Sequence, residues 1–151
     1  MKITRYLALA LAAGLLVCTA TACSSSDDDA LTKSEWVKQA NAICVAGSKK
    51  TEALSKKLQA SGSNPSTKQM NDYIKAATAN SVAQIGEIKD LGYPADDKAE
   101  LEPALVTWEN TLTEMGKNPD KAQELSADKK VTAATTTLRK YGLDKCAGSG
   151  S

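Results

Sequence analysis

Histidine and phenylalanine are both absent from this sequence of 151 residues. Without histidine, the chain cannot build the serine–histidine or cysteine–histidine pairs that activate a nucleophile, or the Glu-x-x-His pairs of di-iron bundles. It also cannot complete a zinc or copper site that combines cysteine with histidine. Gly-x-Gly-x-x-Gly, Walker and EF-hand patterns are missing as well. The sequence therefore predicts no catalytic residue, no cofactor and no metal site, and we expect a protein that is not an enzyme.

Long runs of one charge are also missing. The chain has 19 Lys and Arg against 18 Asp and Glu, and no basic run exceeds two residues. A nucleic-acid-binding surface needs a basic stripe or patch. We therefore expect no nucleic-acid partner.

Strand signals are scarce as well. Between residues 32 and 147 no run of β-branched residues reaches the length of a strand, whereas Ala, Lys, Thr, Glu and Leu dominate. This composition favours helices, and the alanines allow the helices to pack closely around a thin core.

The N-terminal residues have the three parts of a secretory signal peptide. Lys2 and Arg5 precede an uncharged apolar stretch at residues 6–17, and the small residues Ala20, Thr21 and Ala22 follow. Removing this segment leaves the mature chain with 17 basic and 18 acidic side chains. The pattern predicts that residues 1–22 are a signal peptide.

Cys23 follows the small residues directly, and Ala20-Thr21-Ala22-Cys23 resembles the lipobox of bacterial lipoproteins. That resemblance implies a diacylglyceryl group on the Cys23 thiol, cleavage before this residue and often an acylated new amino terminus. Two or three acyl chains give stable anchoring. The alternatives are an ordinary signal peptide cleaved near Ala22 and an uncleaved membrane helix, for which residues 6–17 are short. We favour a lipid anchor at the extracytoplasmic face of the cell membrane.

The stretch after the anchor is small, polar and acidic. Ser24–Asp29 reads SSSDDD and contains no apolar residue, so it can bury nothing. Residues 23–31 are therefore predicted to be the lipidated cysteine and a flexible tether.

Residues 32–147 are predicted to form one helical domain, and 148–151 a disordered tail. Thr32 and Glu35 fit a capping box, and Gly92 and Gly142 are placed to end helices. Helices are expected at about 33–59, from Ser66 or Thr67 to Leu91, at about 96–115, and from Asp120 to Gly142 with a break near Ser126. Pro103 should bend or restart the third helix. We expect an all-α fold, specifically an antiparallel up-down four-helix bundle closed by one disulfide.

The apolar stripes of these helices predict the core. Met70 falls on the buried face of the second helix, and Trp36 and Trp108 lie on stripes of their own. We interpret both tryptophans as core anchors in preference to stacking platforms for a ligand. The pattern does not assign Tyr73 firmly to the core. Tyr93, beside Pro94, is expected at the surface of one end of the bundle.

Cys44 and Cys146 are the two cysteines that remain beyond Cys23. In an oxidising compartment two cysteines normally pair. The bond would close a loop of about 100 residues, worth about 4–5 kcal/mol in the chain-entropy model. The alternative, a redox or metal site, lacks a Cys-x-x-Cys spacing. In an up-down bundle the pairing requires the chain after Tyr141 to fold back along the first helix.

Two short motifs resemble those of small exported actinobacterial lipoproteins. Residues 36–44, WVKQANAIC, resemble the opening of their helical domain, and residues 141–146, YGLDKC, resemble its end. The resemblance implies the architecture, the disulfide and the location, and it assigns no catalytic residue.

Acidic side chains are the remaining candidates for chemistry. Asp96, Asp97, Glu100 and Glu102 cluster near one predicted helix start, and Asp27–Asp29 cluster in the tether. They suit either a weak divalent-cation site or helix capping and solubility, and we favour the latter.

Two functions fit these observations. The first is a non-catalytic module that binds an envelope protein partner, which predicts an exposed apolar patch. The second is a carrier of a small apolar ligand or lipid between the helices, with Ala77, Ser81 and Ala134 leaving room. That function predicts an apolar cavity of ligand size.

Overall fold

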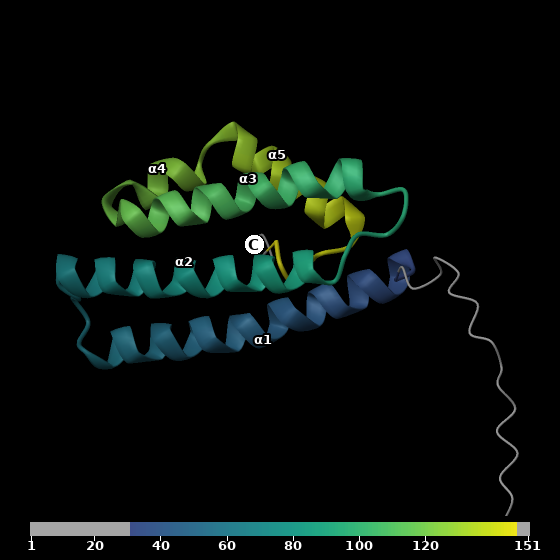
Figure 1. Ribbon diagram of the computed structural model, residues 1–151. Coiled ribbons are helices and arrows are strands. Elements are labelled where there is room, and N and C mark those ends of the chain that lie inside the picture. Colours follow the sequence, from purple (N-terminus) through teal and green to yellow (C-terminus); the bar gives the residue numbers. More distant parts are fainter. Residues whose placement is uncertain (1–30, 148–151) are drawn as a thin grey trace, which may run out of the picture.

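The computed structural model describes residues 31–147, and this part of the chain contains helices and no strand (Figure 1). The all-helical prediction is therefore confirmed. The elements are α1 Lys33–Ala60, α2 Thr67–Asp90, α3 Lys98–Lys117, the 3₁₀ turn η1 Pro119–Lys121, α4 Ala122–Ser126 and α5 Lys129–Tyr141. The predictions for the signal peptide, for Cys23 and the tether up to residue 30, and for the tail at 148–151 fall outside the described residues.

Local sequence signals set the helix ends. Thr32 forms the predicted capping box with Glu35, and Ser66 forms a second one with Gln69. Asp128 caps α5 by accepting from the backbone N–H of Lys130, which explains the break predicted near Ser126. Gly142 ends α5 in the left-handed conformation at φ 111°, as predicted.

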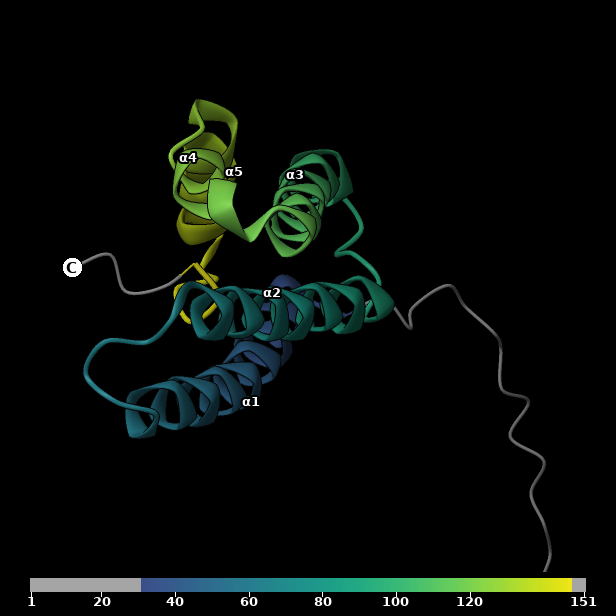
Figure 2. The same cartoon turned by 90° about the vertical axis from the view of Figure 1, so that its left-hand side faces the viewer.

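The helices form two layers, which Figures 1 and 2 show from two sides. The α1–α2 hairpin makes one layer, and α3, α4 and α5 make the other. The hairpin packs on the second layer through α2 and α3, and α3 packs on α5. Direct contact between α1 and α5 is slight. The side between them is closed by residues 142–147, which fold back onto α1 as expected.

The core lies at the end of the molecule where α1 begins and α5 ends. Trp36, Leu101, Leu105, Leu138 and Leu143 are wholly buried there. Ala40, Ile85 and Ile88 complete this cluster, and Tyr141 adds to it. The opposite half of the α1–α2 hairpin contributes no residue to the cluster.

One prediction about the long helices is corrected, and one of two alternatives is excluded. Met70, expected on a buried face, is 38% exposed, because it lies in the first turn of α2, beyond the core cluster. Pro103 does not restart α3, which runs without interruption from Lys98 to Lys117. A proline in the second turn removes one backbone hydrogen bond, and the remaining turns hold the helix together.

The α1–α2 hairpin is closely packed in its middle and open at its free end. The carbonyl of Gly47 and the hydroxyl of Thr51 both accept hydrogen bonds from Asn80, and the missing side chain of Gly47 leaves room for Gln84. From there the two helices separate toward the loop at 61–66 (Figures 1 and 2).

Candidate functional site

The predicted disulfide residues are brought together. Cys44 in α1 and Cys146 beyond α5 are joined as a disulfide, with 2.03 Å between the sulfur atoms. Asn41, one turn before Cys44, holds the same tail with both ends of its amide. Its Nδ2 donates to the Gly142 carbonyl at 2.8 Å, and its Oδ1 accepts from the Lys145 N–H at 3.0 Å. Asn41 and the disulfide therefore close one end of the domain together.

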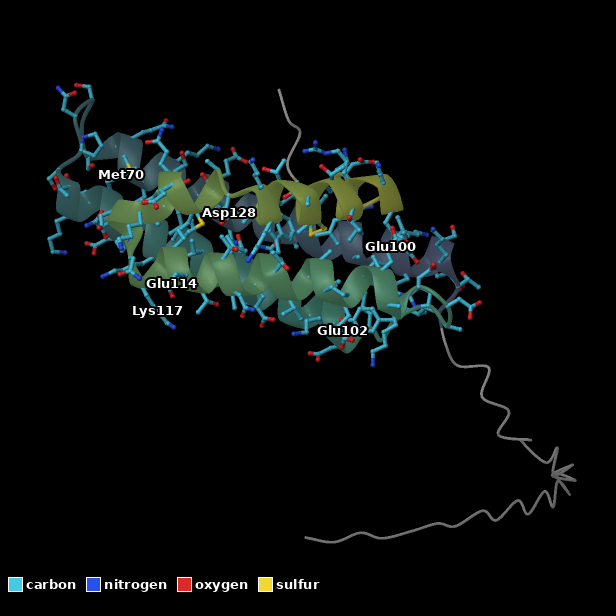
Figure 3. All side chains as sticks on the ribbon, turned by 90° about the horizontal axis from the view of Figure 1, so that it is seen from above. Met70, Glu100, Glu102, Glu114, Lys117 and Asp128 are labelled. Carbon is cyan, nitrogen blue, oxygen red and sulfur yellow. A yellow bond between two sulfur atoms is a disulfide. The ribbon has the colours of Figure 1, made fainter. Side chains whose placement is uncertain are left out.

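The acidic cluster is not assembled into a metal site. Asp97 accepts a hydrogen bond from the Tyr141 hydroxyl, which gives this carboxylate a structural partner. Figure 3 shows Glu100 and Glu102 on opposite sides of α3, as residues two positions apart on a helix must be. Among residues 31–147 no group of three or more Asp, Glu, Cys or His side chains could hold a metal ion.

Trp36 is a core anchor, as predicted. Its ring is wholly buried, its Nε1 donates to the Gly92 carbonyl, and the Tyr141 ring meets it edge-on at 5.6 Å between centroids. Lys33 places its Nζ 3.9 Å from the centre of the Tyr141 ring. Burial and the bond to Asp97 both raise the pKa of Tyr141, so its hydroxyl is neutral throughout the physiological range.

Tyr93, expected at the surface of one end of the bundle, is partly exposed and also packs against the core there. Its ring stacks near Trp36, with 6.5 Å between centroids, and its hydroxyl is buried without a hydrogen-bond partner. Burial raises the pKa of this hydroxyl. Tyr93 thereby covers part of the core, and Pro94 beside it is buried.

Trp108 is partly buried and borders a small cavity beside the disulfide. The volume is about 80 Å³, and Ser81 also borders it, whereas Ala134 is packed into the core. Ligand sites in proteins usually measure about 300–1,000 Å³. This cavity is therefore too small for the lipid or apolar ligand considered above.

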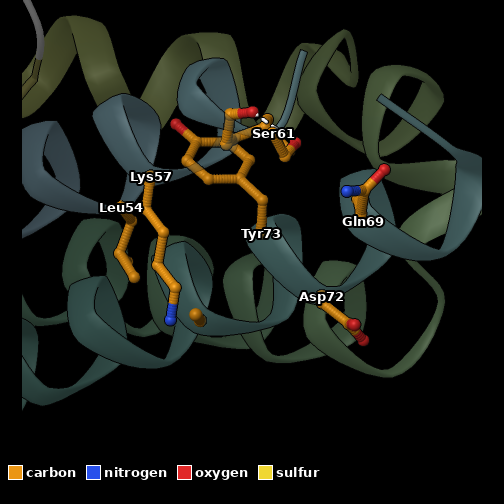
Figure 4. A pocket seen from close by; sticks show the side chains of 8 residues that line it. Leu54, Lys57, Ser61, Gln69, Asp72 and Tyr73 are labelled. Carbon is orange, nitrogen blue, oxygen red and sulfur yellow. Dashed lines mark hydrogen bonds between the residues drawn. The ribbon is translucent and has the colours of Figure 1, made fainter. Parts of the chain in front are cut away.

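A larger hollow lies at the free end of the α1–α2 hairpin, where the helices separate (Figure 4). We call it the hairpin groove, and its volume is about 320 Å³. Its lining residues are Leu54, Lys57, Leu58 and Ser61 from α1 and its cap, and Gln69, Asp72, Tyr73 and Ala76 from α2. The apolar members are half-buried and the charged members are exposed. The groove has an apolar floor and a polar rim.

The sequence patterns do not predict the hairpin groove, although they place several of its residues on helix stripes. Leu54 and Leu58 fall on the predicted stripe of the first helix, and Tyr73 follows Met70 by one turn. A stripe predicts which residues face a neighbouring helix, but the angle between the helices decides whether they touch. The sequence signal that points to the groove is Gly47, because a glycine lets the two helices approach closely at its own position and not farther along.

Other large apolar side chains are exposed singly. Val45, Met70 and Val106 are the exposed large hydrophobic residues among those described, and they lie on three different helices. Single exposed apolar side chains are ordinary on protein surfaces. Of the three, Met70, labelled in Figure 3, follows directly after Gln69, which lines the hairpin groove.

Comparison with known proteins adds no assignment. No family model matches the chain, and no curated protein and no solved structure matches it either. Within residues 31–147, no helix has both the length and the apolar content to cross a membrane.

Proposed function

We propose that this chain is a membrane-anchored lipoprotein of the extracytoplasmic face. Cys23 carries the lipid, and residues 24–30 are the tether, since Leu31 packs against the core. The helical domain is a non-catalytic module that binds an envelope protein partner. The lipobox resemblance and the signal-peptide pattern support the anchor. The observation that carries the binding role is the hairpin groove, an apolar hollow of about 320 Å³ with a polar rim.

The position of the groove fits this role. α1 starts shortly after the tether, and the groove lies at its other end, beside Leu54 and Leu58. A helix of 28 residues is about 40 Å long at about 1.5 Å per residue. The groove can therefore stand well away from the point of anchoring, where a partner can reach it.

We also propose a finer architecture for the helical domain. In it α1, α2, α3 and α5 alternate in direction as an up-down bundle, and the Cys44–Cys146 bond joins the first helix to the end of the last. Short connections and the packing of each long helix on the next one support this arrangement.

The anchor is tested by the intact mass of the protein extracted from membranes. We expect cleavage before Cys23, two or three acyl chains on that residue, and two hydrogens fewer than the reduced chain. The Cys23→Ser variant should lose the acyl mass and leave the membrane fraction. An unacylated residue 23 in the wild type would contradict the proposal.

The binding role is tested by a photo-crosslinking amino acid at Tyr73 in living cells. We expect a defined envelope protein to be captured from this position and not from Ala133, an exposed site on α5. Leu58→Glu, which places a charge in the groove and keeps a good helix former, should abolish the capture. A wild-type groove that captures no protein would overturn the binding role.

The carrier function remains the second candidate, and the same groove is the feature that favours it. Its volume reaches the lower end of the range for ligand sites, about 300 Å³, and its floor is apolar. Mass spectrometry of lipids that co-purify with the protein separates the two functions. A stoichiometric apolar molecule, lost in Leu58→Glu, would favour the carrier.

A further inference from the structure

The free half of the α1–α2 hairpin is basic. Residues 45–77 contain six lysines, all exposed, and two acidic side chains. The lysines are Lys49, Lys50, Lys56, Lys57, Lys68 and Lys75. A later part of the chain has the opposite balance, since residues 87–117 contain eight acidic side chains and three lysines. Charge is therefore unevenly distributed along the sequence, although the overall charge of the chain is small.

Both acidic side chains of the free half are already paired. Glu52 contacts Lys56 at 2.6 Å, and Asp72 contacts Lys68 at 2.6 Å. The other four lysines, at 49, 50, 57 and 75, have no ion-pair partner among the described residues. Four lysines of the free half thus take part in none of these ion pairs, and one of them, Lys57, lines the hairpin groove.

Helix geometry relates three of these lysines, Lys50, Lys57 and Lys75, to the groove. Lys50, Leu54 and Lys57 are four and three residues apart, so they lie along one face of α1. Lys75 follows Asp72 by three residues and is next to Ala76, two residues that line the groove from α2. Lys57 itself borders the groove (Figure 4). An ammonium group therefore borders the apolar floor on the α1 side, and Lys75 is close in sequence to the lining residues of α2.

We propose that the hairpin groove docks an acidic amphipathic helix of the partner protein. An apolar stripe on that helix would fill the floor formed by Leu54, Leu58 and Tyr73, as in other helix-in-groove contacts. Asp and Glu residues beside the stripe would face Lys50, Lys57 and Lys75. This inference rests on the proposed binding role and adds the chemistry of the partner.

The test uses two labelled peptides of about 18 residues, long enough to place apolar anchors over several helical turns. Both carry leucines at helical spacing, and one has glutamates where the other has glutamines. Binding is measured by fluorescence anisotropy to the mature chain with Cys23→Ser, which needs no detergent. We expect the glutamate peptide to bind about tenfold more tightly at low salt, because each exposed pair changes affinity a few-fold. This preference should shrink at high salt.

Matched variants locate the effect. The triple variant K50Q/K57Q/K75Q should remove the preference for the glutamate peptide. K129Q/K130Q/K140Q makes the same charge change at exposed positions on α5 and should leave it intact. Circular dichroism should show the same helix content in both.

Four outcomes would overturn the inference. Three concern the peptides: equal binding of both, binding of neither, or an equal effect of the two triple variants. The fourth is lysine-dependent binding to phosphatidylglycerol vesicles in place of the peptide. Salt-sensitive self-association of the protein would also overturn the inference. The groove would then be occupied by the acidic residues 87–117 of a second copy. In cells, the photo-crosslinking amino acid at Tyr73 gives a further test. If it still captures a partner after the three lysines are replaced, the binding role stands and the acidic helix is refuted.

Discussion

The two ends of the α1–α2 hairpin contain the same kinds of apolar residue, but these residues are buried to different extents. At the disulfide end, Trp36 and Ala40 of α1 and Ile85 and Ile88 of α2 are wholly or almost wholly buried. At the free end, Leu54, Leu58 and Tyr73 remain half-exposed around a hollow. The first end is covered by α3, α5 and the tail, whereas in the free half α1 has α2 as its main neighbour. An apolar stripe becomes buried core or the lining of a hollow according to what lies over it.

The two ends of the hairpin also differ in role, since one stabilises the fold and the other is the part that we propose binds a partner. The residues that hold the domain together are gathered at the disulfide end, so the free end can change with little effect on folding. Four predictions test this division, and they run from the largest expected effect to the smallest.

Removing the disulfide should have the largest effect. Cys44→Ala combined with Cys146→Ala frees a loop of about 100 residues and should lower the free energy of unfolding by about 4–5 kcal/mol. Urea denaturation measures this difference, and the wild type under reducing conditions is the control. A loss below about 1 kcal/mol would show that the hydrogen bonds of Asn41, and not the covalent bond, close this end.

A matched pair of leucines compares the ends directly. Leu105→Ala empties a wholly buried position and should cost about 2–5 kcal/mol. Leu58→Ala removes a half-exposed side chain from the hairpin groove and should cost about 1 kcal/mol or less. Both are measured by urea denaturation. Equal losses would show that the free end is part of the cooperative core.

Two asparagines make a finer comparison, because the side chain of each makes two hydrogen bonds to another segment. Asn41→Ala frees the tail and should cost about 1–3 kcal/mol, at about 1 kcal/mol for each lost bond. Asn80→Ala removes the bonds to Gly47 and Thr51. It should mainly speed amide hydrogen exchange in residues 47–60. Faster exchange across the whole domain would contradict a separate free end.

The smallest effect at neutral pH concerns the tyrosines of the disulfide end. Burial raises the pKa of Tyr141 and Tyr93 above the ordinary value of 10.0. A group whose pKa is higher in the folded state stabilises that state below its unfolded pKa and loses the contribution as the pH rises. The domain should therefore lose stability above about pH 10. Tyr141→Phe should flatten this loss in denaturation measured from pH 8 to pH 11, and an unchanged slope would contradict it.

The ends of the helices are the most predictable part of the structure, because they depend on residues a few positions apart. Thr32 with Glu35 and the glycine at 142 both act as their sequence patterns predict. The return of the tail along α1 is predictable for a different reason, since pairing Cys44 with Cys146 leaves the chain little choice. Local chemistry and one covalent constraint thus account for most of the fold.

The remaining differences arise where burial depends on distant neighbours. Spacing alone cannot distinguish Met70 from Ile88, which both fall on the stripe of the second helix. Ile88 is buried because it belongs to the core cluster, whereas no core residue reaches Met70. Tyr93 is partly buried because Trp36, far away in the sequence, packs against it. The hairpin groove depends on the angle between two helices, which no single stripe encodes. Lipidation of Cys23 stays a prediction.

The place of Leu143 in the core has a consequence for how the protein reaches its destination. This residue is wholly buried in the same cluster as Trp36, although more than a hundred positions separate the two in the sequence. A polypeptide exported with its N-terminus first, as the proposed anchor requires, cannot complete this core until residue 143 has emerged from the channel. If the proposed export is right, translocation of the whole domain precedes its folding, and no completed core obstructs the channel.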